Sequence, residues 1–366
     1  MTFRRWGVLG ALVATASIVA GCVPPDGGGG GVVPPCPARQ KVAVETTDQT
    51  DFSIARGVSA NGRWLVTSRT VAGELRLSLR EIGSVAPPVS VGATSTESSD
   101  DPAAVAVADD GSAVAYQVPP DEHGPRRVVR WDRATDTITP LTPPNPGLQF
   151  RMTGPDATLV AWEDEVMAPT VVVTESLTDE VVGTWTGIGY YSSGGASASG
   201  RHDGGRDHAT GSSTSLQPGF DAIAVAHPLW EDVRVRSMSP SGTFALFEAD
   251  LVVSGVVQSR LWSYELASST LTSLGQGMFG AAQIDDLGRA VTLRAIDLVH
   301  GALELRDGTG VVSTLATVGR LAPTAVEDSR WGPQRAFLGT PDLRAVVYTE
   351  FPVLATTAVV QASRCQ

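Results

Sequence analysis

Lysine is almost absent from this chain. Among its 366 residues only Lys41 is a lysine, arginine supplies the other basic residues, and aspartate and glutamate together number 39. The formal net charge is −12. A surface of that sign repels nucleic acid and anionic lipid. We therefore expect no nucleic-acid partner for the folded part of the protein.

Long apolar runs are also missing, apart from the first twenty residues. Outside that segment no window places apolar residues at helical spacing, and valine, threonine and serine dominate between 39 glycines and 24 prolines. This composition favours many short strands joined by turns. A hydrophobic content of 42% is ordinary for a protein with a packed core.

Catalytic motifs are missing as well. The sequence holds no Gly-x-Ser-x-Gly elbow, no His-Glu-x-x-His pattern and no phosphate-binding glycine loop between a strand and a helix. We expect no cofactor, and we favour a binding protein over an enzyme. Enzymes that use scattered residues instead of a local motif keep the enzymatic alternative open.

The N-terminus has the pattern of an export signal. Arg4 and Arg5 precede an apolar stretch, residues 6–19, that is too short to span a bilayer comfortably. The sequence Val-Ala-Gly-Cys that ends at Cys22 resembles the lipobox of bacterial lipoproteins. That resemblance implies cleavage before Cys22 and a diacylglycerol on its sulfur. An ordinary secretory signal, an uncleaved anchor and export by the twin-arginine route remain open.

A tether follows the signal. Residues 23–35 hold five consecutive glycines and two Pro-Pro pairs, so they offer no apolar face to bury. We assign residues 1–21 to a signal peptide, 22–38 to the tether and 39–366 to one folded domain. A lipid before the tether would place that domain outside the cytoplasm, anchored to the cell membrane or envelope.

Two short patterns recur along the folded part. The first is a tight turn between two alternating strands, and the second is an acidic residue that ends a strand before another turn. The turns centre on residues 62, 111, 157, 242, 288 and 343, and the acidic positions are 132, 175, 265 and 307. Both series have a period of about 45 residues and one double gap between 180 and 240, which gives seven units.

A four-stranded unit of this length, repeated six or more times, is typical of a β-propeller. The Ser-Pro-Ser-Gly sequence at 239–242 and the Trp-Asp pair at 131–132 resemble the WD-repeat-like blades of TolB-type propeller proteins, over about residues 42–363. We expect an all-β propeller of seven blades. Six blades and a superhelical solenoid are the alternatives. The resemblance implies a ligand at the mouth of the central channel or on the loops of one face.

The two ends of the domain complement each other. The last unit is one strand short, and residues 41–46 form a spare strand before the first full unit. Pairing of these terminal strands would close the propeller and protect its edges. It would also bring Cys36 and Cys365 together, which are the two cysteines left once Cys22 carries lipid. We expect them to form a disulfide. Two unrelated thiols are the alternative.

One polar cluster lies where the repeat breaks down, between about 186 and 236. It contains four side chains that could donate nitrogen and oxygen ligands to a metal. These are His202, Asp203, Asp207 and His208. The surrounding glycine- and serine-rich segment, 192–215, has few apolar anchors, which favours an exposed loop. We expect no metal site, and we keep these four residues as the alternative.

The remaining conspicuous residues are interpreted as structural. Trp64, Trp131, Trp162 and Trp262 fall at equivalent strand positions, which favours packing between blades over a sugar-stacking platform. Taken together, the sequence predicts a membrane-anchored, monomeric lipoprotein that binds a protein or small ligand or acts as a scaffold. The alternatives are an extracytoplasmic enzyme acting on glycans or peptides and a purely structural envelope protein.

Overall fold

The protein is described here by a computed structural model. The chain divides into two units, Met1–Pro35 and Cys36–Gln366. The structure describes residues of the second unit only, and these are 36, 38–48, 50–71, 74–92, 105–118, 127–141, 148–153, 159–164, 170–175, 181–186, 202–203, 206–207, 230–239, 243–253, 256–276, 279–296, 301–318, 320–321, 337–351 and 356–365. Within these ranges, no helix has the length and apolar character needed to cross a membrane.

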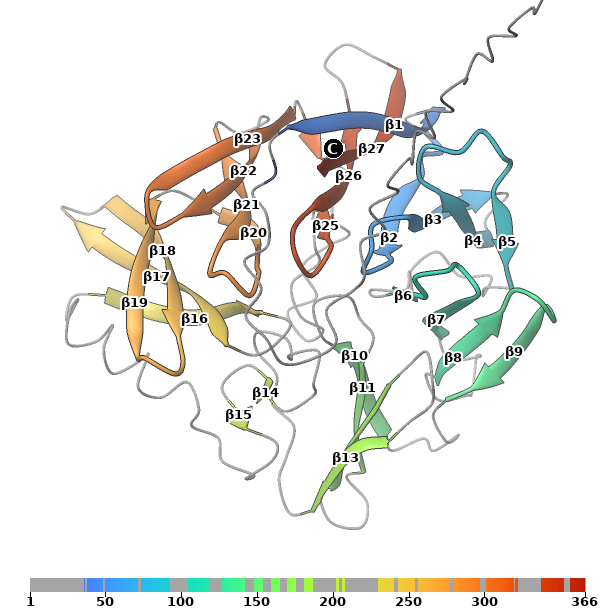
Figure 1. Ribbon diagram of the computed structural model, residues 1–366, viewed down its shortest axis with the longest axis horizontal. Helices are drawn as coiled ribbons and strands as arrows, with labels where there is room; N and C mark the ends of the chain where they lie inside the picture. The colour runs from blue at the N-terminus through green and yellow to red at the C-terminus, as the bar shows by residue number, and fades with distance from the viewer. Residues whose placement is uncertain are drawn as a thin grey trace, which may run out of the picture. The chain divides into compact units, whose positions relative to one another are not determined.

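All regular structure in the described residues is β-strand, arranged in antiparallel sheets (Figure 1). Sheet B contains β2 (Ile54–Val58), β3 (Trp64–Val71), β4 (Glu74–Glu81) and β5 (Val89–Val91). Sheet C contains β6 (Val105–Val107), β7 (Ala113–Val118), β8 (Arg127–Asp132) and β9 (Thr137–Pro140). Sheet D contains β10 (Leu148–Thr153), β11 (Leu159–Asp164), β12 (Thr170–Glu175) and β13 (Val181–Thr186).

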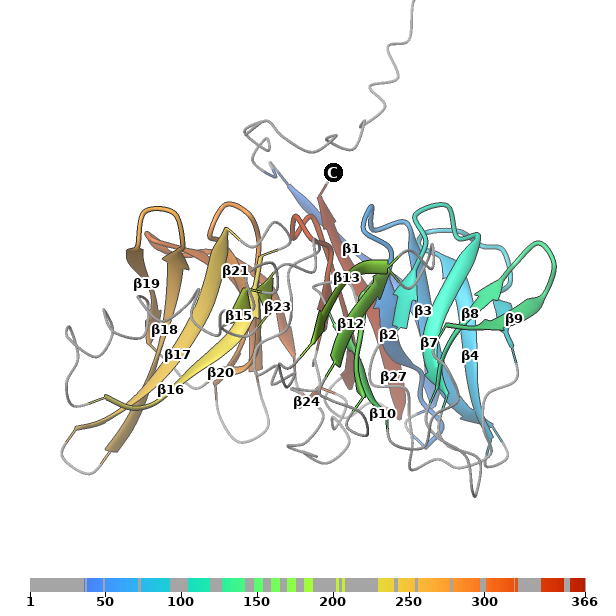
Figure 2. The same cartoon turned by 90° about the horizontal axis from the view of Figure 1, so that it is seen from below.

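The second half of the chain repeats this arrangement (Figure 2). Sheet F contains β16 (Trp230–Met238), β17 (Phe244–Val253), β18 (Val256–Glu265) and β19 (Thr270–Gln276). Sheet G contains β20 (Phe279–Ile284), β21 (Ala290–Ala295), β22 (Gly301–Asp307) and β23 (Gly310–Val318). A two-stranded sheet, β14 (His202–Asp203) with β15 (Arg206–Asp207), lies between D and F in the sequence.

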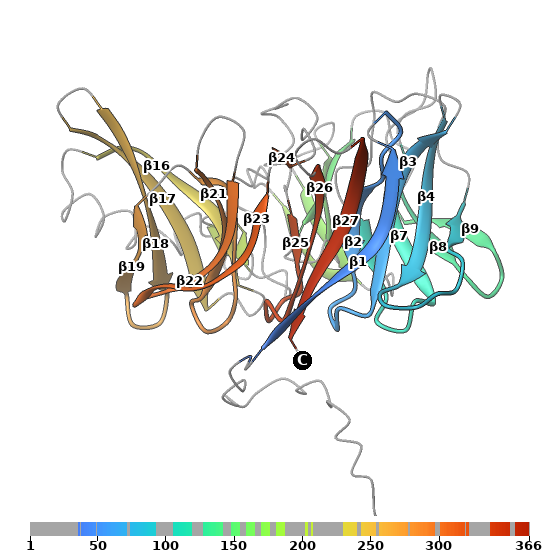
Figure 3. The same cartoon turned by 90° about the horizontal axis from the view of Figure 1, so that it is seen from above.

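Sheet A joins the two ends of the folded unit. It contains β1 (Arg39–Asp48), β24 (Arg320–Leu321), β25 (Phe337–Gly339), β26 (Ala345–Phe351) and β27 (Thr357–Cys365). The first strand, β1, pairs with the last, β27, from Arg39 opposite Cys365 to Asp48 opposite Thr357 (Figure 3). The predicted pairing of the terminal strands is therefore present.

The strands follow from alternation along the sequence. In β4 the apolar residues Leu75, Leu77 and Leu79 are buried, whereas Arg76 is exposed and Arg80 is half-buried. This period of two places the leucines on one face of sheet B. One face of the sheet can therefore pack against a neighbouring sheet.

The core consists of clusters between neighbouring sheets. Residues of B and C form one cluster, A and G share a second, A and B share a third, and F and G share a fourth. Trp64 and Trp131, which are 9% and 1% exposed, both lie in the cluster between B and C. These two tryptophans pack between sheets, as the sequence predicted.

The described clusters connect the sheets in the order F, G, A, B and C. Sheets that follow one another in sequence thus pack face to face, and sheet A stands between the last sheet and the first. This is the packing expected of β-propeller blades. The prediction of an all-β propeller is confirmed. The number of blades stays a prediction, because the segment between β13 and β16 is largely outside the described residues.

Candidate functional site: the turn end of the sheets

In sheets B, C, F and G, two connections between strands lie at the same end of the sheet. Because the strands alternate in direction, the turn between the first and second strands lies at the same end as the turn between the third and fourth. We call this the turn end of a sheet, and we call the opposite end the loop end. In five sheets, backbone hydrogen bonds close the first of these turns. They run Ser59–Trp64, Ala108–Ala113, Ser239–Phe244, Asp285–Arg289 and Thr340–Ala345.

The first turn needs a left-handed backbone position, as the sequence predicted. Gly62, Gly111 and Gly288 have φ values of 68°, 69° and 71°, and Leu343 takes the same position with φ 54°. Glycine adopts this region without a steric cost. Leu343 is only 1% exposed and packs in the cluster between sheets A and G, so burial of its side chain offsets the unfavourable backbone.

The same glycines also allow neighbouring blades to approach closely. A Cβ added to Gly111 would lie 2.5 Å from the indole of Trp64, and one added to Gly62 would lie 2.8 Å from Cβ of Ala345. Trp64 and Ala345 each begin the second strand of the preceding blade. The turn of one blade therefore packs against the start of the second strand of the preceding blade.

The second turn is held by the predicted acidic residues. Asp132 ends β8 and accepts hydrogen bonds from the backbone N–H groups of Ala134 and Thr135 at 2.9 and 3.1 Å. Asp307 ends β22 and accepts from the N–H of Thr309 at 2.7 Å. These hydrogen bonds lower the pKa of both carboxyl groups. The repeated acidic position is thus part of the scaffold.

Polar contacts join the turns of neighbouring sheets. The backbone N–H of Asn61 donates to the Asp109 carboxylate at 2.8 Å, which links sheets B and C. Gln283 of sheet G donates to the carbonyl of Gly339 at 3.0 Å and accepts from its N–H at 3.1 Å. Sheets G and A are linked by this amide. At the turn end, hydrogen bonds thus join sheet B to sheet C and sheet G to sheet A.

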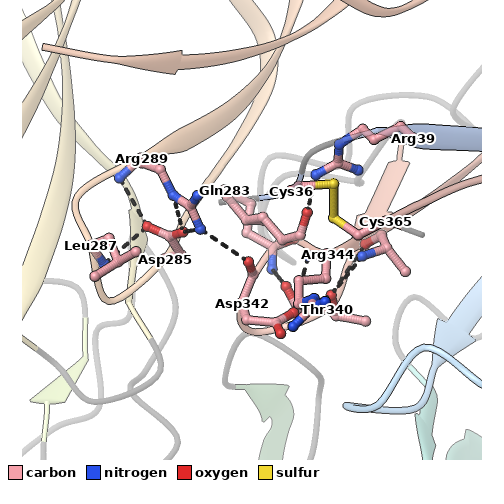
Figure 4. Close-up of polar contacts among 12 residues, drawn as sticks. Cys36, Arg39, Gln283, Asp285, Leu287, Arg289, Thr340, Asp342, Arg344 and Cys365 are labelled. Atoms are coloured by element: carbon pink, nitrogen blue, oxygen red, sulfur yellow. Dashed lines mark hydrogen bonds and ion pairs between the residues drawn. A yellow bond between two sulfur atoms is a disulfide. The ribbon is translucent and has the colours of Figure 1, made fainter. Parts of the chain in front are cut away.

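The terminal strands meet the turn end beside sheet G (Figure 4). The Arg39 guanidinium donates to the carbonyl of Leu343, and Arg289 donates to the carbonyl of Asp342 at 3.4 Å. Burial and the charge of Arg289 lower the pKa of Arg39. Burial raises the pKa of Asp285, although Arg289 opposes this effect.

A disulfide closes the same corner. Cys36 and Cys365 are bonded, with Cα atoms 5.4 Å apart and a sequence separation of 329 residues (Figure 4). In the chain-entropy model, a cross-link over so long a loop stabilises the folded state by as much as about 5 kcal/mol. The N–H of Cys365 also donates to the carbonyl of Arg344 at 2.8 Å. The start of the folded unit is thereby fixed to the turn end of sheet A.

A buried ion cluster lies within sheet G. Glu304 is 3% exposed and pairs with Arg306, and it also accepts from Arg294 at 2.7 Å. Burial alone raises the pKa of Glu304, but the hydrogen bonds and charges of the two arginines outweigh it and lower that pKa. Arg306 in turn donates to the carbonyl of Leu274 in sheet F at 2.9 Å. The cluster joins two blades and is structural.

The predicted polar cluster is only partly described. His202 lies opposite Asp207, and Asp203 lies opposite Arg206, in the ladder between β14 and β15. Their side chains and all of His208 lie outside the described residues. No group of three or more metal-ligating side chains is present among those that the structure describes.

Two further predictions concern residues that the structure does not describe. Cys22, the predicted lipid attachment site, lies in the first unit, outside the described residues. All five histidines of the chain have side chains outside the described set. The contacts of Gln283 with Gly339 and of Arg289 with Asp342 could not be predicted from the sequence, because each spans more than 50 residues and leaves no local pattern. Both contacts are structural.

Several solved structures are similar to this chain in fold. The chain is similar to oligogalacturonate lyase from Vibrio parahaemolyticus, with a TM-score of 0.50, 10% identity, and coverage of 89% of this chain and 96% of that one. The chain has a β-propeller fold. No family model matches the sequence, and no curated protein matches it.

Other similar structures share less of their geometry with this propeller. TolB from Acinetobacter baumannii gives a TM-score of 0.40 at 14% identity and is matched by 85% of this chain. The propeller spans 64% of the length of that TolB. The β-propeller domain of the Trilobed protease from Pyrococcus furiosus gives 0.48 at 12% identity, with coverage of 86% and 94%. These identities bear on the fold alone.

Proposed function

We propose that this chain is an extracytoplasmic lipoprotein whose propeller acts as a binding or scaffold module. Cys22 is the lipid attachment site, residues 22–38 are the tether, and the loop end of the blades carries the partner surface. The protein works as a monomer without a cofactor.

The observation that carries this proposal is the contrast between the two ends of the blades. At the turn end, tight turns are hydrogen-bonded to one another across sheets, and Cys36 begins the folded unit there. The connections at the loop end vary in length, from residues 72–73 to residues 92–104. Connections of variable length on a rigid scaffold are where binding residues concentrate. The tether therefore enters at one end, and the other end is free to meet a partner.

The described part of the loop end offers polar and aromatic groups. Arg69 pairs with Asp51 at 2.6 Å, and both side chains are more than a third exposed. Beside them, Phe52 stacks edge-on against Phe351 with ring centroids 4.9 Å apart. Phe351 is only 8% exposed, so the aromatic pair packs beneath the charged side chains. Exposed charges suit a polar protein partner better than an apolar small molecule.

Cell fractionation tests the anchor. The native protein is expected in the membrane fraction and the Cys22→Ser variant in the soluble fraction. Native protein that stays soluble would contradict the lipoprotein proposal.

Capture from envelope extracts tests the partner surface. Arg69→Glu at the loop end is expected to reduce recovery of bound protein, and Arg63→Glu at the turn end is the matched control. Both arginines form exposed ion pairs, so the variants differ mainly in position. Equal losses in both variants would contradict a loop-end surface, and turnover of an envelope glycan or peptide by the purified protein would favour an enzyme instead.

A further inference from the structure

The disulfide lies at the junction between the tether and the first strand of the folded unit. Cys36 precedes β1, and Arg39 of β1 lies directly opposite Cys365 in the β1–β27 ladder. The bond is therefore at the end of the ladder that the tether reaches first. Any tension applied along the tether arrives at this point before it reaches a hydrogen bond of sheet A.

Without the disulfide, that tension would act on an edge strand. Among the described strands, β1 is the outermost of sheet A and pairs with β27 alone. Pulling on its end would load this ladder together with the contacts of β1 to sheet B, where Arg80 pairs with Glu45 at 3.2 Å and donates to the carbonyl of Val44 at 2.9 Å. Lys41 adds one ion pair, to Glu350 of β26 at 2.9 Å, which is a modest contribution for a partly exposed pair.

The disulfide moves the load to an interior strand. β27 pairs with β1 on one side and with β26 on the other, from Ala345 opposite Arg364 to Glu350 opposite Val359. Tension that arrives at Cys365 therefore acts on β27, which can move only by leaving β26 together with β1 or by leaving both of its neighbours.

Loss of β1 would also leave one edge of β27 without a paired strand. Arg364 is the only charged residue of β27, and Ala358, Val360 and Ala362 are buried in sheet A. A long strand edge without charges invites pairing with another chain. By contrast, β1 carries Arg39, Lys41, Glu45 and Asp48 along the edge that it presents.

We propose that the Cys36–Cys365 disulfide is a mechanical clamp: it transmits tension from the tether past β1 into β27, so that β1 and β27 stay paired while the tether is pulled. The clamp rests on the proposed function, because an anchored protein that holds a partner is loaded between its lipid and its loop end. The device is redox-sensitive, since reduction returns the load to the β1–β27 ladder.

Single-molecule pulling tests the clamp on the chain from residue 22, with Cys22→Ser so that no lipid is attached. One handle is at the N-terminus, and the other is at Ile296, an exposed residue between β21 and β22 at the loop end of sheet G. Reduced protein, and a Cys36→Ser/Cys365→Ser variant, are expected to show an early low-force step of up to about 45 Å as residues 36–48 detach. The oxidised protein is expected to lack this step.

A second geometry verifies the bond itself. With handles at the N-terminus and at Gln366, the oxidised protein is expected to show no unfolding extension, because the cross-link bridges a sequence separation of 329 residues. Reduced protein should release about 1,100 Å. Lys41→Met is the matched control, since it removes the ion pair of the same sheet and leaves the disulfide intact. In the first pulling geometry, the oxidised Lys41→Met variant is expected to show no early step.

The outcomes separate the clamp from the anchor. An early step at the same force in oxidised and reduced protein would overturn the clamp, and so would full extension between the two ends of the oxidised chain. If the double variant does not fold, reduction of already folded wild-type protein in the instrument gives the same comparison. Fractionation of the native lipoprotein reports on the anchor separately, so failure of the anchor and failure of the clamp are distinguishable.

Discussion

Gly111 of sheet C lies against the indole ring of Trp64 in sheet B, so closely that a Cβ on the glycine would stand 2.5 Å from the ring. The glycine also has φ 69°. Two independent constraints, backbone conformation and contact between blades, thus meet at one residue. We expect such positions to dominate the sensitivity of the turn end to substitution.

Gly111→Ala should therefore lower the free energy of unfolding by about 2–4 kcal/mol, from left-handed strain and overpacking together. Gly83→Ala is the matched control, because Gly83 has φ 85° and no atom within 4 Å of an added Cβ. It should cost only the backbone strain, about 1–2 kcal/mol. Urea denaturation of both variants measures the difference, and equal losses would mean that the contact with Trp64 is unimportant.

Asp109 should contribute to the connection between sheets B and C through its carboxylate. Asp109→Ala removes the acceptor for the N–H of Asn61 and should cost about 1 kcal/mol. Asp109→Asn keeps an acceptor oxygen and should cost less than half as much. Thermal denaturation distinguishes the two. A loss in the Asn variant as large as that in the Ala variant would show that the negative charge, and not the hydrogen bond, matters.

Ionisation of Glu304 should make the free energy of unfolding depend on pH. Its pKa is lowered in the folded state, so its contribution is present above its unfolded pKa of about 4.3 and is lost as the pH falls through the folded value. Glu304→Gln leaves Arg306 buried without its carboxylate and should cost about 3–5 kcal/mol at pH 7. The difference from wild type should shrink below pH 4.

The exposed pair of Arg63 and Glu81 provides the control for this prediction. Glu81→Gln should cost at most about 1 kcal/mol, because solvent screens the pair. Denaturant unfolding between pH 3 and pH 7 measures both variants. A pH-independent difference between Glu304→Gln and wild type would show that Glu304 is not ionised in the folded protein.

Much of the scaffold could be predicted from local sequence. The turns need glycine at 62, 111 and 288 because of backbone sterics, and the carboxylates at 132 and 307 cap the following backbone N–H groups. Both requirements act within a few residues, so they leave a periodic trace in the sequence. That trace was sufficient to predict the four-stranded units and the pairing of β1 with β27.

The contacts between blades left no such trace. Gln283 reaches Gly339, and Lys41 reaches Glu350, across 56 and 309 residues. Arg294 and Glu304 come together because of the register between β21 and β22, and the length of the connection at 296–300 does not determine that register. The turn at Leu343 could be predicted only from the spacing of the repeats, because leucine rarely adopts a left-handed backbone conformation. Pairings of this kind depend on packing of whole sheets and cannot be read from single segments.

The central claim is an anchored propeller whose first residues are covalently tied to its last strand. Peptide mass mapping of the native protein, isolated from membranes without reductant, tests it most directly. We predict a first residue Cys22 that carries a diacylglycerol, and a peptide containing Cys36 linked to a peptide containing Cys365. A chain that begins at Met1, or free thiols at both Cys36 and Cys365, would contradict the account.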